Sequence, residues 1–110
     1  MKIFISGPIR KYAHCGYNRE AFMLCEKYYL ERGHAIMNPI RLHTRYPERL
    51  SHEDYMRVCF AMLDVCDVIA LLPGWQDSEG ARQEYERAYL LKKTIIRVGI
   101  TADDRRLSEL

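Results

Sequence analysis

One short apolar run constrains the fold of this chain more than any other feature. Residues 67–72 read Asp-Val-Ile-Ala-Leu-Leu and are followed at once by Pro73-Gly74, a pair typical of turns. A run of this length between polar and turn residues is typical of a strand that is buried on both faces. Such strands occur mainly in parallel sheets that helices cover, so the run predicts an α/β protein.

Hydrophobic spacing elsewhere predicts three more strands and three helices. The strands are expected at residues 2–6, 34–38 and 94–98, and the helices at 18–32, at 51–66 and from about 80 to 91. Asn18 and Ser51 are predicted to cap the first two helices. The alternation predicts right-handed crossovers and therefore a three-layer Rossmann-like (flavodoxin-like) α/β fold. We expect a parallel four-stranded sheet of order 2-1-3-4 with helices on both faces.

These elements form one domain, residues 1–98, as a length of 110 residues allows. The tail, residues 99–110, shows no clear pattern, and both a short helix and disorder are open there. Residues 39–50 combine two prolines with Arg41, Arg45 and Arg49 and predict an exposed basic loop. These arginines are either solvated charges or part of a mobile arm that closes over a phosphate.

Composition excludes several classes of function. The formal net charge is +2, which argues against a nucleic-acid partner because a duplex-binding domain carries a concentrated basic stripe. No apolar run approaches the ~20 residues of a membrane span, and a Gly-Pro pair follows the first residues too early for a secretory signal. We therefore expect a cytoplasmic protein without membrane contact. The cysteines form no CxxC pair and are expected to be reduced thiols: Cys15, Cys25, Cys59 and Cys66.

Ligands of parallel α/β sheets bind beyond the carboxyl ends of the strands, at the switch between strands 1 and 3. Two loops reach that edge here, residues 6–17 after the first strand and residues 73–80 after the third. Both are longer than a plain connection requires. We expect the functional site between them.

Glu84 is the strongest candidate for chemistry in this region. It falls beside the apolar stripe predicted for Ala81, Tyr85, Ala88 and Tyr89, close to the start of its helix. The positive end of the helix dipole is expected to keep its carboxylate ionised, as a nucleophile requires. Glutamate is common in first helical turns for the same electrostatic reason, so position alone also allows a purely structural role.

Neighbouring residues form a candidate anion site. Ser78 and Gly80 precede the helix of Glu84, where a hydroxyl and backbone N–H groups can converge on an anion. At the end of the first strand, Gly7 permits close backbone approach and Arg10 can bind a phosphate with two hydrogen bonds. The alternatives are an N-cap serine with a turn glycine, and a solvated arginine.

Two further observations concern the same loops. The chain contains no P-loop and no GxGxxG motif, so a standard ATP or dinucleotide site is not supported. Trp75 in the second loop either stacks on a nucleobase or packs over its own loop.

Four stretches carry a family resemblance. In chain order they are Lys2-Ile3-Phe4-Ile5-Ser6-Gly7-Pro8-Ile9, Gly33-His34 to Asn38-Pro39, Asp67 to Pro73-Gly74-Trp75, and Ser78-x-Gly80-Ala81-x-x-Glu84-x-x-x-Ala88. Together they resemble the nucleoside 2-deoxyribosyltransferase-like superfamily over about residues 1–98. The resemblance is to its small bacterial and phage branch and, among characterised relatives, to the 2′-deoxynucleoside 5′-phosphate N-hydrolases.

The resemblance implies an activity. In that superfamily the glutamate matching Glu84 attacks C1′ of a 2-deoxyribose and displaces the base, and water or a second base resolves the glycosyl-enzyme. Transferases of free nucleosides tend to carry an aspartate six residues earlier, whereas hydrolases of the 5′-monophosphates carry a phosphate-binding serine. Ser78 and Arg10 match the hydrolases, which favours a nucleotide ligand because a serine hydroxyl can donate to a phosphate.

Two positions depart from the family pattern. The tyrosine whose hydroxyl orients the glutamate aligns with Phe4, which has no hydroxyl. The aspartate thought to protonate or hold the leaving base aligns with Cys59, and a thiol is a poor substitute acid. Loss of a positioned acid typically costs about 10²–10⁴ in rate. Either another group supplies the proton, or the fold is retained for binding.

The resemblance thus implies an enzyme, hydrolase or transferase, that acts on the N-glycosidic bond of 2′-deoxynucleosides or their 5′-monophosphates, with Glu84 as nucleophile. The ligand is expected to contact Ser6, Gly7, Ile9, Arg10, Ser78 and Gly80. No metal or organic cofactor is expected. A homodimer or larger homo-oligomer is implied, because superfamily members complete their sites across a subunit interface. The alternative is a non-catalytic module on the same fold that binds or senses a nucleotide.

Overall fold

A five-stranded sheet forms the centre of the protein. The computed structural model describes residues 1–10, 18–45, 50–101, 103 and 105–110. The strands are β1 (Lys2–Ser6), β2 (Ala35–Met37), β3 (Val68–Leu71), β4 (Thr94–Ile100) and β5 (Leu107–Glu109). Their order is β2-β1-β3-β4-β5, with parallel pairing except between β4 and β5. The predicted α/β class and the order 2-1-3-4 are confirmed, but the sheet has one strand more than expected.

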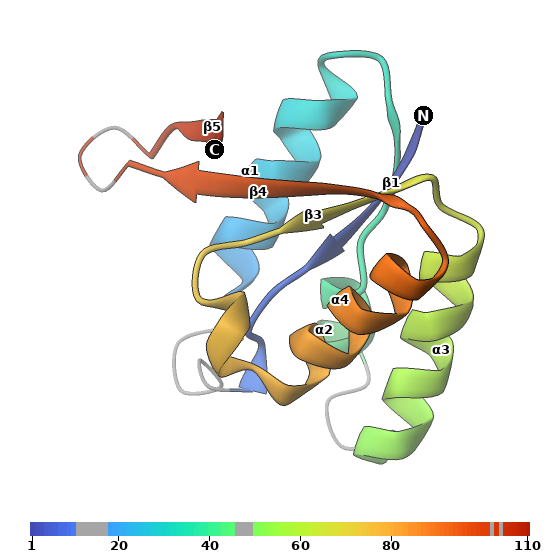
Figure 1. The fold of residues 1–110 in the computed structure, drawn as a ribbon. Coiled ribbons are helices and arrows are strands. Elements are labelled where there is room, and N and C mark those ends of the chain that lie inside the picture. Colours follow the sequence, from blue (N-terminus) through green and yellow to red (C-terminus); the bar gives the residue numbers. More distant parts are fainter. Residues whose placement is uncertain (11–17, 46–49, 102, 104) are drawn as a thin grey trace.

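Helices cover both faces of the sheet. In the described part of the chain they are α1 (Arg19–Leu30), α2 (Ile40–Arg45), α3 (His52–Asp64) and α4 (Glu79–Leu90), with a short 3-10 turn, η2, at Trp75–Asp77. Figure 1 shows α1 on one side of the sheet and α3 and α4 on the other. The three layers of the predicted Rossmann-like fold are therefore present.

The apolar run that predicted this fold occupies the middle of the sheet. All four residues of β3 are fully buried, because the strand lies between β1 and β4 and has helices on both faces. Burying one such aliphatic side chain stabilises the fold by about 1.5–3 kcal/mol. The central strands therefore form a rigid base for the loops that follow their carboxyl ends.

The C-terminal tail is neither a short helix nor disordered in its described part. It forms β5, in which Leu107 is buried and pairs with Ile100. The Tyr29 hydroxyl donates a 2.9 Å hydrogen bond to the carboxylate of Glu109, which joins α1 to the new edge strand. Three residues are too few to show a strand period in sequence, so only pairing with β4 reveals this element.

The segment predicted as an exposed basic loop begins as a helix. The Asn38 side chain accepts a 3.1 Å hydrogen bond from the backbone N–H of Ile40, which is fully buried at the start of α2. Arg41 donates two hydrogen bonds, of 2.7 and 2.8 Å, to the Glu26 carboxylate. Arg41 is therefore part of a structural ion pair. Arg49 and the side chain of Arg45 lie outside the described residues.

The two predicted helix caps differ. Ser51 is confirmed as a cap, because its Oγ accepts a 3.0 Å hydrogen bond from the N–H of Asp54. Asn18 occupies the N-cap position of α1 but makes no side-chain cap bond. Its side chain donates instead to the Pro8 carbonyl at 3.0 Å, and so ties α1 to the segment after β1.

The cysteines in the described part of the chain are buried free thiols: Cys25, Cys59 and Cys66. Cys15 lies outside the described residues.

Candidate active site

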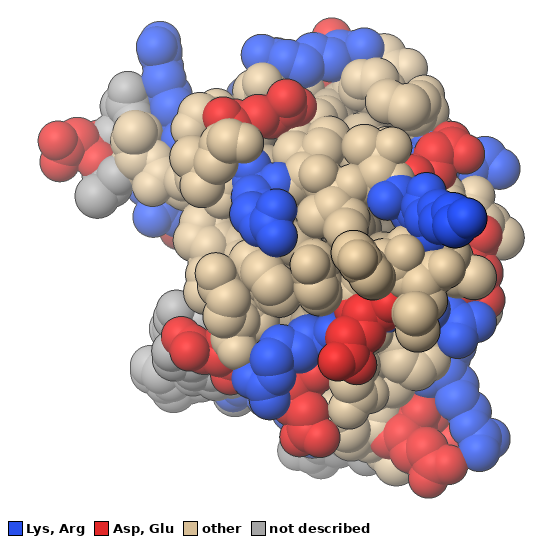
Figure 2. Space-filling model, viewed as in Figure 1, with Lys and Arg blue, Asp and Glu red and all other residues tan. Residues whose placement is uncertain are grey.

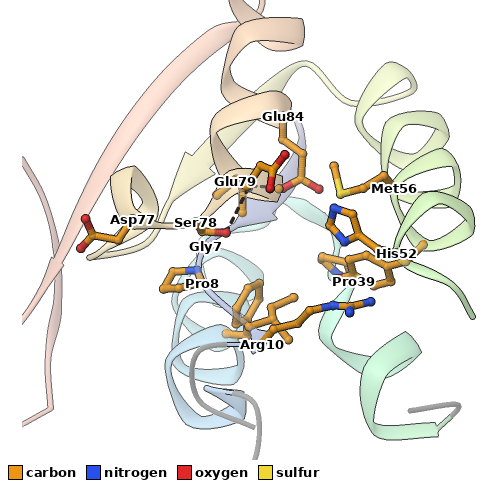
Figure 3. Close-up of a pocket in the computed structure, with 16 residues that line it drawn as sticks. Gly7, Pro8, Arg10, Pro39, His52, Met56, Asp77, Ser78, Glu79 and Glu84 are labelled. Atoms are coloured by element: carbon orange, nitrogen blue, oxygen red, sulfur yellow. Dashed lines mark hydrogen bonds between the residues drawn. The ribbon is translucent and has the colours of Figure 1, made fainter. Parts of the chain in front are cut away.

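A pocket of about 360 Å³ lies at the carboxyl edge of the sheet (Figure 3). This volume falls within the range of about 300–1,000 Å³ that is typical of small-molecule sites. Its walls come from the end of β1 and the segment after it, from the amino-terminal halves of α3 and α4 with the residues just before α4, and from Phe22 and Pro39. They include all seven residues predicted to form the site: Ser6, Gly7, Ile9, Arg10, Ser78, Gly80 and Glu84.

The topology explains why these distant segments meet. β1 and β3 are parallel neighbours, so the chain leaves both strands at the same edge of the sheet. The backbone pairing continues one step beyond the strands, where the N–H of Leu72 donates a 2.8 Å hydrogen bond to the Ser6 carbonyl. The residues that follow each strand are therefore held side by side, as the switch-point rule predicts.

Glu84 is buried in the inner wall of the pocket, with 5% of its surface exposed. The Ser6 hydroxyl, at the end of β1, donates a 2.6 Å hydrogen bond to its Oε1 atom. The buried stripe of α4 consists of Ala81, Glu84 and Ala88, whereas Tyr89, predicted to be buried, is 65% exposed. The two small alanines allow α4 to approach the sheet closely, and this approach brings Glu84 against β1.

The expectation that the helix dipole keeps the Glu84 carboxylate ionised is wrong. Burial raises the pKa of its carboxyl group to about 7, although hydrogen bonds from Ser6 and Cys59 act in the opposite direction. The helix dipole does not prevail, because Glu84 lies beyond the first turn of α4 and the dipole effect is largely confined to that turn. At neutral pH the carboxyl group is therefore present in both protonation states in comparable amounts.

A hydroxyl contacts Glu84 even though Phe4 has none. Phe4 is completely buried in the core. Ser6 lies two residues further along the same strand, and alternate residues of a strand face the same side of the sheet. Ser6 therefore places a hydroxyl on the side of β1 that faces α4, and no sequence motif had assigned it that contact.

Cys59 contacts Glu84 from α3. It is fully buried, and its thiol lies close enough to Glu84 and Tyr55 for each of them to influence its pKa. Burial and the Glu84 charge raise the pKa of the Cys59 thiol well above its usual value. The thiol therefore stays neutral and stabilises the Glu84 carboxylate. An acid that protonates a ligand would line the pocket, and Cys59 is not among the residues that line it.

Ser78 caps α4 as the structural alternative requires. Its Oγ accepts a 3.2 Å hydrogen bond from the N–H of Ala81. A hydroxyl that accepts in this way still has its own proton to donate. Because Ser78 also lines the pocket, the cap leaves it able to donate to an anion there.

The two glycines of the site serve packing as well. A Cβ atom on Gly7 would lie 2.7 Å from Cβ of Leu72, so the close approach that Gly7 permits is to this neighbouring segment. A Cβ atom on Gly80 would lie 3.2 Å from Sδ of Met56. Gly80 thus lets the first turn of α4 pack closely against α3.

Arg10 and Trp75 occupy different places. Arg10 is exposed, and Figure 3 shows it at the end of the pocket remote from Glu84. The Trp75 ring packs on Tyr85, with ring centroids 4.8 Å apart, and does not line this pocket. Trp75 therefore packs against α4, the helix that follows its loop.

The pocket also contains residues that sequence reasoning missed, among them His52, Met56 and Pro39. A signal for the first of these was present. Ser51 was predicted to begin the helix that follows the second strand, and helices that follow strands of such a sheet begin near its ligand-binding edge. The residue after that cap, His52, is therefore in a position where a site residue is expected.

Metal-binding clusters and membrane spans are both absent from the described residues. Within the described ranges, no cluster of three or more His, Cys, Asp or Glu side chains is arranged to hold a metal ion. No helix in the described part of the chain has the length and apolar character needed to cross a membrane.

Fold and pocket together define a class: a Rossmann-like α/β protein with a buried, hydrogen-bonded carboxyl group in a pocket at the carboxyl edge of its sheet. Over residues 1–97 the chain matches the family described as Domain of unknown function (DUF4406). Because this match covers most of its length, the chain belongs to that family. No similar sequence was found among curated proteins.

Proposed function

We propose that this protein cleaves or transfers the N-glycosidic bond of 2′-deoxynucleosides or their 5′-monophosphates, with Glu84 as the nucleophile. The observation that carries the proposal is the buried Glu84 carboxyl group, held by a 2.6 Å hydrogen bond from Ser6 in the wall of the pocket. The same pocket contains Ser78, which resembles the phosphate-binding serine of the N-hydrolases, and Arg10, which resembles an arginine in the loop after their first strand.

The chemistry follows from this arrangement. One carboxylate oxygen of Glu84 attacks C1′ of the deoxyribose, the C1′–N bond breaks, and its electron pair leaves with the base. Water, or a second base, then attacks C1′ and releases Glu84, so the configuration at C1′ is retained. Ser6 holds the carboxylate in one orientation, and a pKa of about 7 leaves a large ionised fraction at neutral pH.

A 5′-phosphate is the group that fits the opening of α4. The first N–H groups of a helix and its dipole favour an anion, and the hydroxyl of Ser78 lies at this end of α4. Arg10 adds a guanidinium group to the same pocket, and Figure 3 shows this group on the side of His52 and Pro39. We therefore favour the monophosphates over free nucleosides.

The test uses a panel of the four deoxynucleosides and their 5′-monophosphates, with ribonucleotides as controls. Chromatography measures the free base that is released from each. Wild-type protein should release free base, and Glu84→Ala should not. Adding a second free base to the reaction separates transfer from hydrolysis. A nucleotide with fluorine on C2′ of its sugar should trap the glycosyl-enzyme. The peptide that contains Glu84 should then gain the mass of the fluorinated sugar phosphate.

Two results would count against this assignment. Base release that persists in Glu84→Ala would exclude Glu84 as the nucleophile. Tight nucleotide binding without turnover would favour the second candidate, a non-catalytic nucleotide-binding or sensing module. That candidate is favoured by the neutral, buried thiol of Cys59, at the position where the nucleoside 2-deoxyribosyltransferase-like superfamily has an aspartate.

The proposal includes a homodimer or larger assembly acting in the cytoplasm. Figure 2 shows an uncharged area in the middle of one face, with charged side chains of both signs around it. Large apolar side chains at the end of α4 are exposed: Tyr89, Leu90 and Leu91. Light scattering of the wild type and of Leu90→Glu measures whether these side chains contribute to an interface.

A further inference from the structure

We propose that His52 is the acid that protonates the departing base. This inference rests on the proposed function and supplies the proton donor that Cys59 cannot provide. His52 is the first residue of α3, is exposed to solvent and lines the pocket. Its imidazole ring lies close to the first turn of α4, because a Cβ atom on Gly80 would be 3.9 Å from Cε1 of His52.

The arrangement of the pocket sets the direction in which a nucleotide would lie. Figure 3 shows Ser78 on one side of the pocket and His52 on the other, with Glu84 between them. A phosphate bound at Ser78 places the deoxyribose beside Glu84. The base then extends toward His52, where Met56 and Pro39 provide apolar surface for a flat ring.

The acidic side chains at the start of α4 lie on the Ser78 side of the pocket, across from His52. Figure 3 shows the Asp77 carboxylate directed away from the cavity. The Glu79 carboxylate accepts a 3.4 Å hydrogen bond from the side chain of Gln83 and so lies along its own helix. Both groups therefore lie across the pocket from the place that the base would occupy.

The remaining titratable groups beside Glu84 or elsewhere in the pocket hold their protons too firmly. Burial raises the pKa of both Tyr55 and Cys59 far above neutrality, and the guanidinium group of Arg10 does not lose its proton in proteins. Imidazole, in contrast, gains and loses a proton near neutral pH and is the commonest general acid of enzymes. Among the described groups of the pocket, His52 is therefore the one suited to this step.

The step balances as follows. A carboxylate oxygen of Glu84 forms a bond to C1′ while the C1′–N bond breaks, and the electron pair of that bond passes to the base. The N–H proton of the His52 imidazolium moves to a ring nitrogen or carbonyl oxygen of the base, which leaves neutral. Neutral His52 then accepts a proton from the water that attacks C1′, and the freed Glu84 carboxylate completes the cycle.

The test compares two substrates that differ in their need for an acid. The first is the natural nucleotide that is cleaved fastest in the panel. The second is its counterpart with a permanently cationic base, the N7-methyl derivative for a purine or an N-pyridinium analogue for a pyrimidine. A cationic base leaves as a neutral molecule without accepting a proton, so its release needs no acid.

His52→Gln should lower kcat/KM for the natural nucleotide by about 10²–10⁴ and leave kcat/KM for the cationic substrate close to the wild-type value. The ratio kcat/KM reports the steps up to base release, and so excludes the later attack of water, in which His52 also acts on either substrate. Equal losses of kcat/KM on both substrates, or no loss of kcat/KM on either, would overturn the assignment of His52. So would a wild-type enzyme that cleaves only the cationic substrate. A wild-type protein that cleaves neither would refute the proposed function itself, and this inference with it.

His34→Gln is the matched control. It makes the same chemical change beside the amino end of β2, where the His34 ring lies 3.3 Å from the N-terminal nitrogen and outside the pocket. This variant should cleave both substrates at wild-type rates. Because His52 is exposed, His52→Gln should also unfold at close to the wild-type temperature.

Discussion

The Ser6 hydroxyl donates a 2.6 Å hydrogen bond to the carboxylate of Glu84, a residue 78 positions away in the chain. Ser6 ends strand β1, the neighbour of the central strand, and Glu84 lies on the buried stripe of α4. One contact thus joins the core of the sheet to the candidate nucleophile. Because the fold holds the carboxylate, substitutions in the fold should change the pKa of Glu84 and its orientation.

Replacing Ser6 with alanine should raise the pKa of Glu84 above 7. The hydrogen bond from the Ser6 hydroxyl stabilises the charged carboxylate and lowers its pKa, whereas burial raises that pKa. Without the hydroxyl, the effect of burial increases relative to the effects that lower the pKa. The carbon-13 shift of the Glu84 carboxyl group, followed in a pH titration by NMR, measures this change directly. Ser108→Ala on β5, outside the pocket, should leave the titration unchanged. A Glu84 pKa that is the same in Ser6→Ala and wild type would contradict the role of the bond.

Glu84→Gln should be more stable than the wild type at pH 8. The pKa of Glu84 is about 7 in the folded protein, against an ordinary value of 4.5, so between these values the folded state binds more protons. Stability therefore falls as pH rises through this window, by roughly 3 kcal/mol at pH 8. A glutamine does not titrate and avoids this cost.

Urea unfolding of both proteins at pH 4.5 and pH 8 measures the effect. Wild type and Glu84→Gln should differ least at the lower pH, where the carboxyl group is largely protonated in the folded state and about half protonated in the unfolded state. A stability difference that does not change between the two pH values would show that burial does not perturb Glu84.

Two substitutions of Ser78 should separate its roles as helix cap and as phosphate ligand. Ser78→Ala removes the hydrogen bond to Ala81 and should destabilise the protein by about 1 kcal/mol. Ser78→Asp keeps an oxygen that can cap α4 but adds a negative charge, which should weaken binding of a deoxynucleoside monophosphate by about tenfold or more. Calorimetric titration with the monophosphate and the nucleoside measures this, and equal affinities in Ser78→Asp and wild type would exclude a phosphate at this position.

Gly7→Ala should destabilise the protein more than Gly80→Ala. The Cβ atom added to Gly7 would lie 2.7 Å from Leu72 Cβ, which is fixed to the backbone of the neighbouring segment, so the chain must shift at a cost of about 1–3 kcal/mol. At Gly80 the nearest atom, 3.2 Å away, is the flexible sulfur of Met56, and alanine is the better helix former. Thermal unfolding compares the two, and the opposite order of stability would contradict this account.

Local patterns were enough to predict most of the fold. The apolar run at residues 67–72 predicted a strand buried on both faces, and β3 is fully buried in the centre of the sheet. The Ser51 cap depends on residues three apart and was also predicted correctly. The short strand β5 and the helix α2 were missed, because pairing with β4 and the side-chain bonds of Asn38 and Arg41 define them.

The amino-acid sequence by itself determined which segments become most of the strands and helices, the order of the first four strands, and the edge of the sheet at which the seven predicted site residues gather. Only the tertiary structure decided what those residues contact: that Ser6 binds Glu84, that His52 faces the same pocket, and that Glu84 has a pKa of about 7. The physical reason is one of range. Strand and helix periods depend on near neighbours in the chain, whereas the burial of a carboxyl group and its hydrogen-bond partners depend on how distant segments pack together.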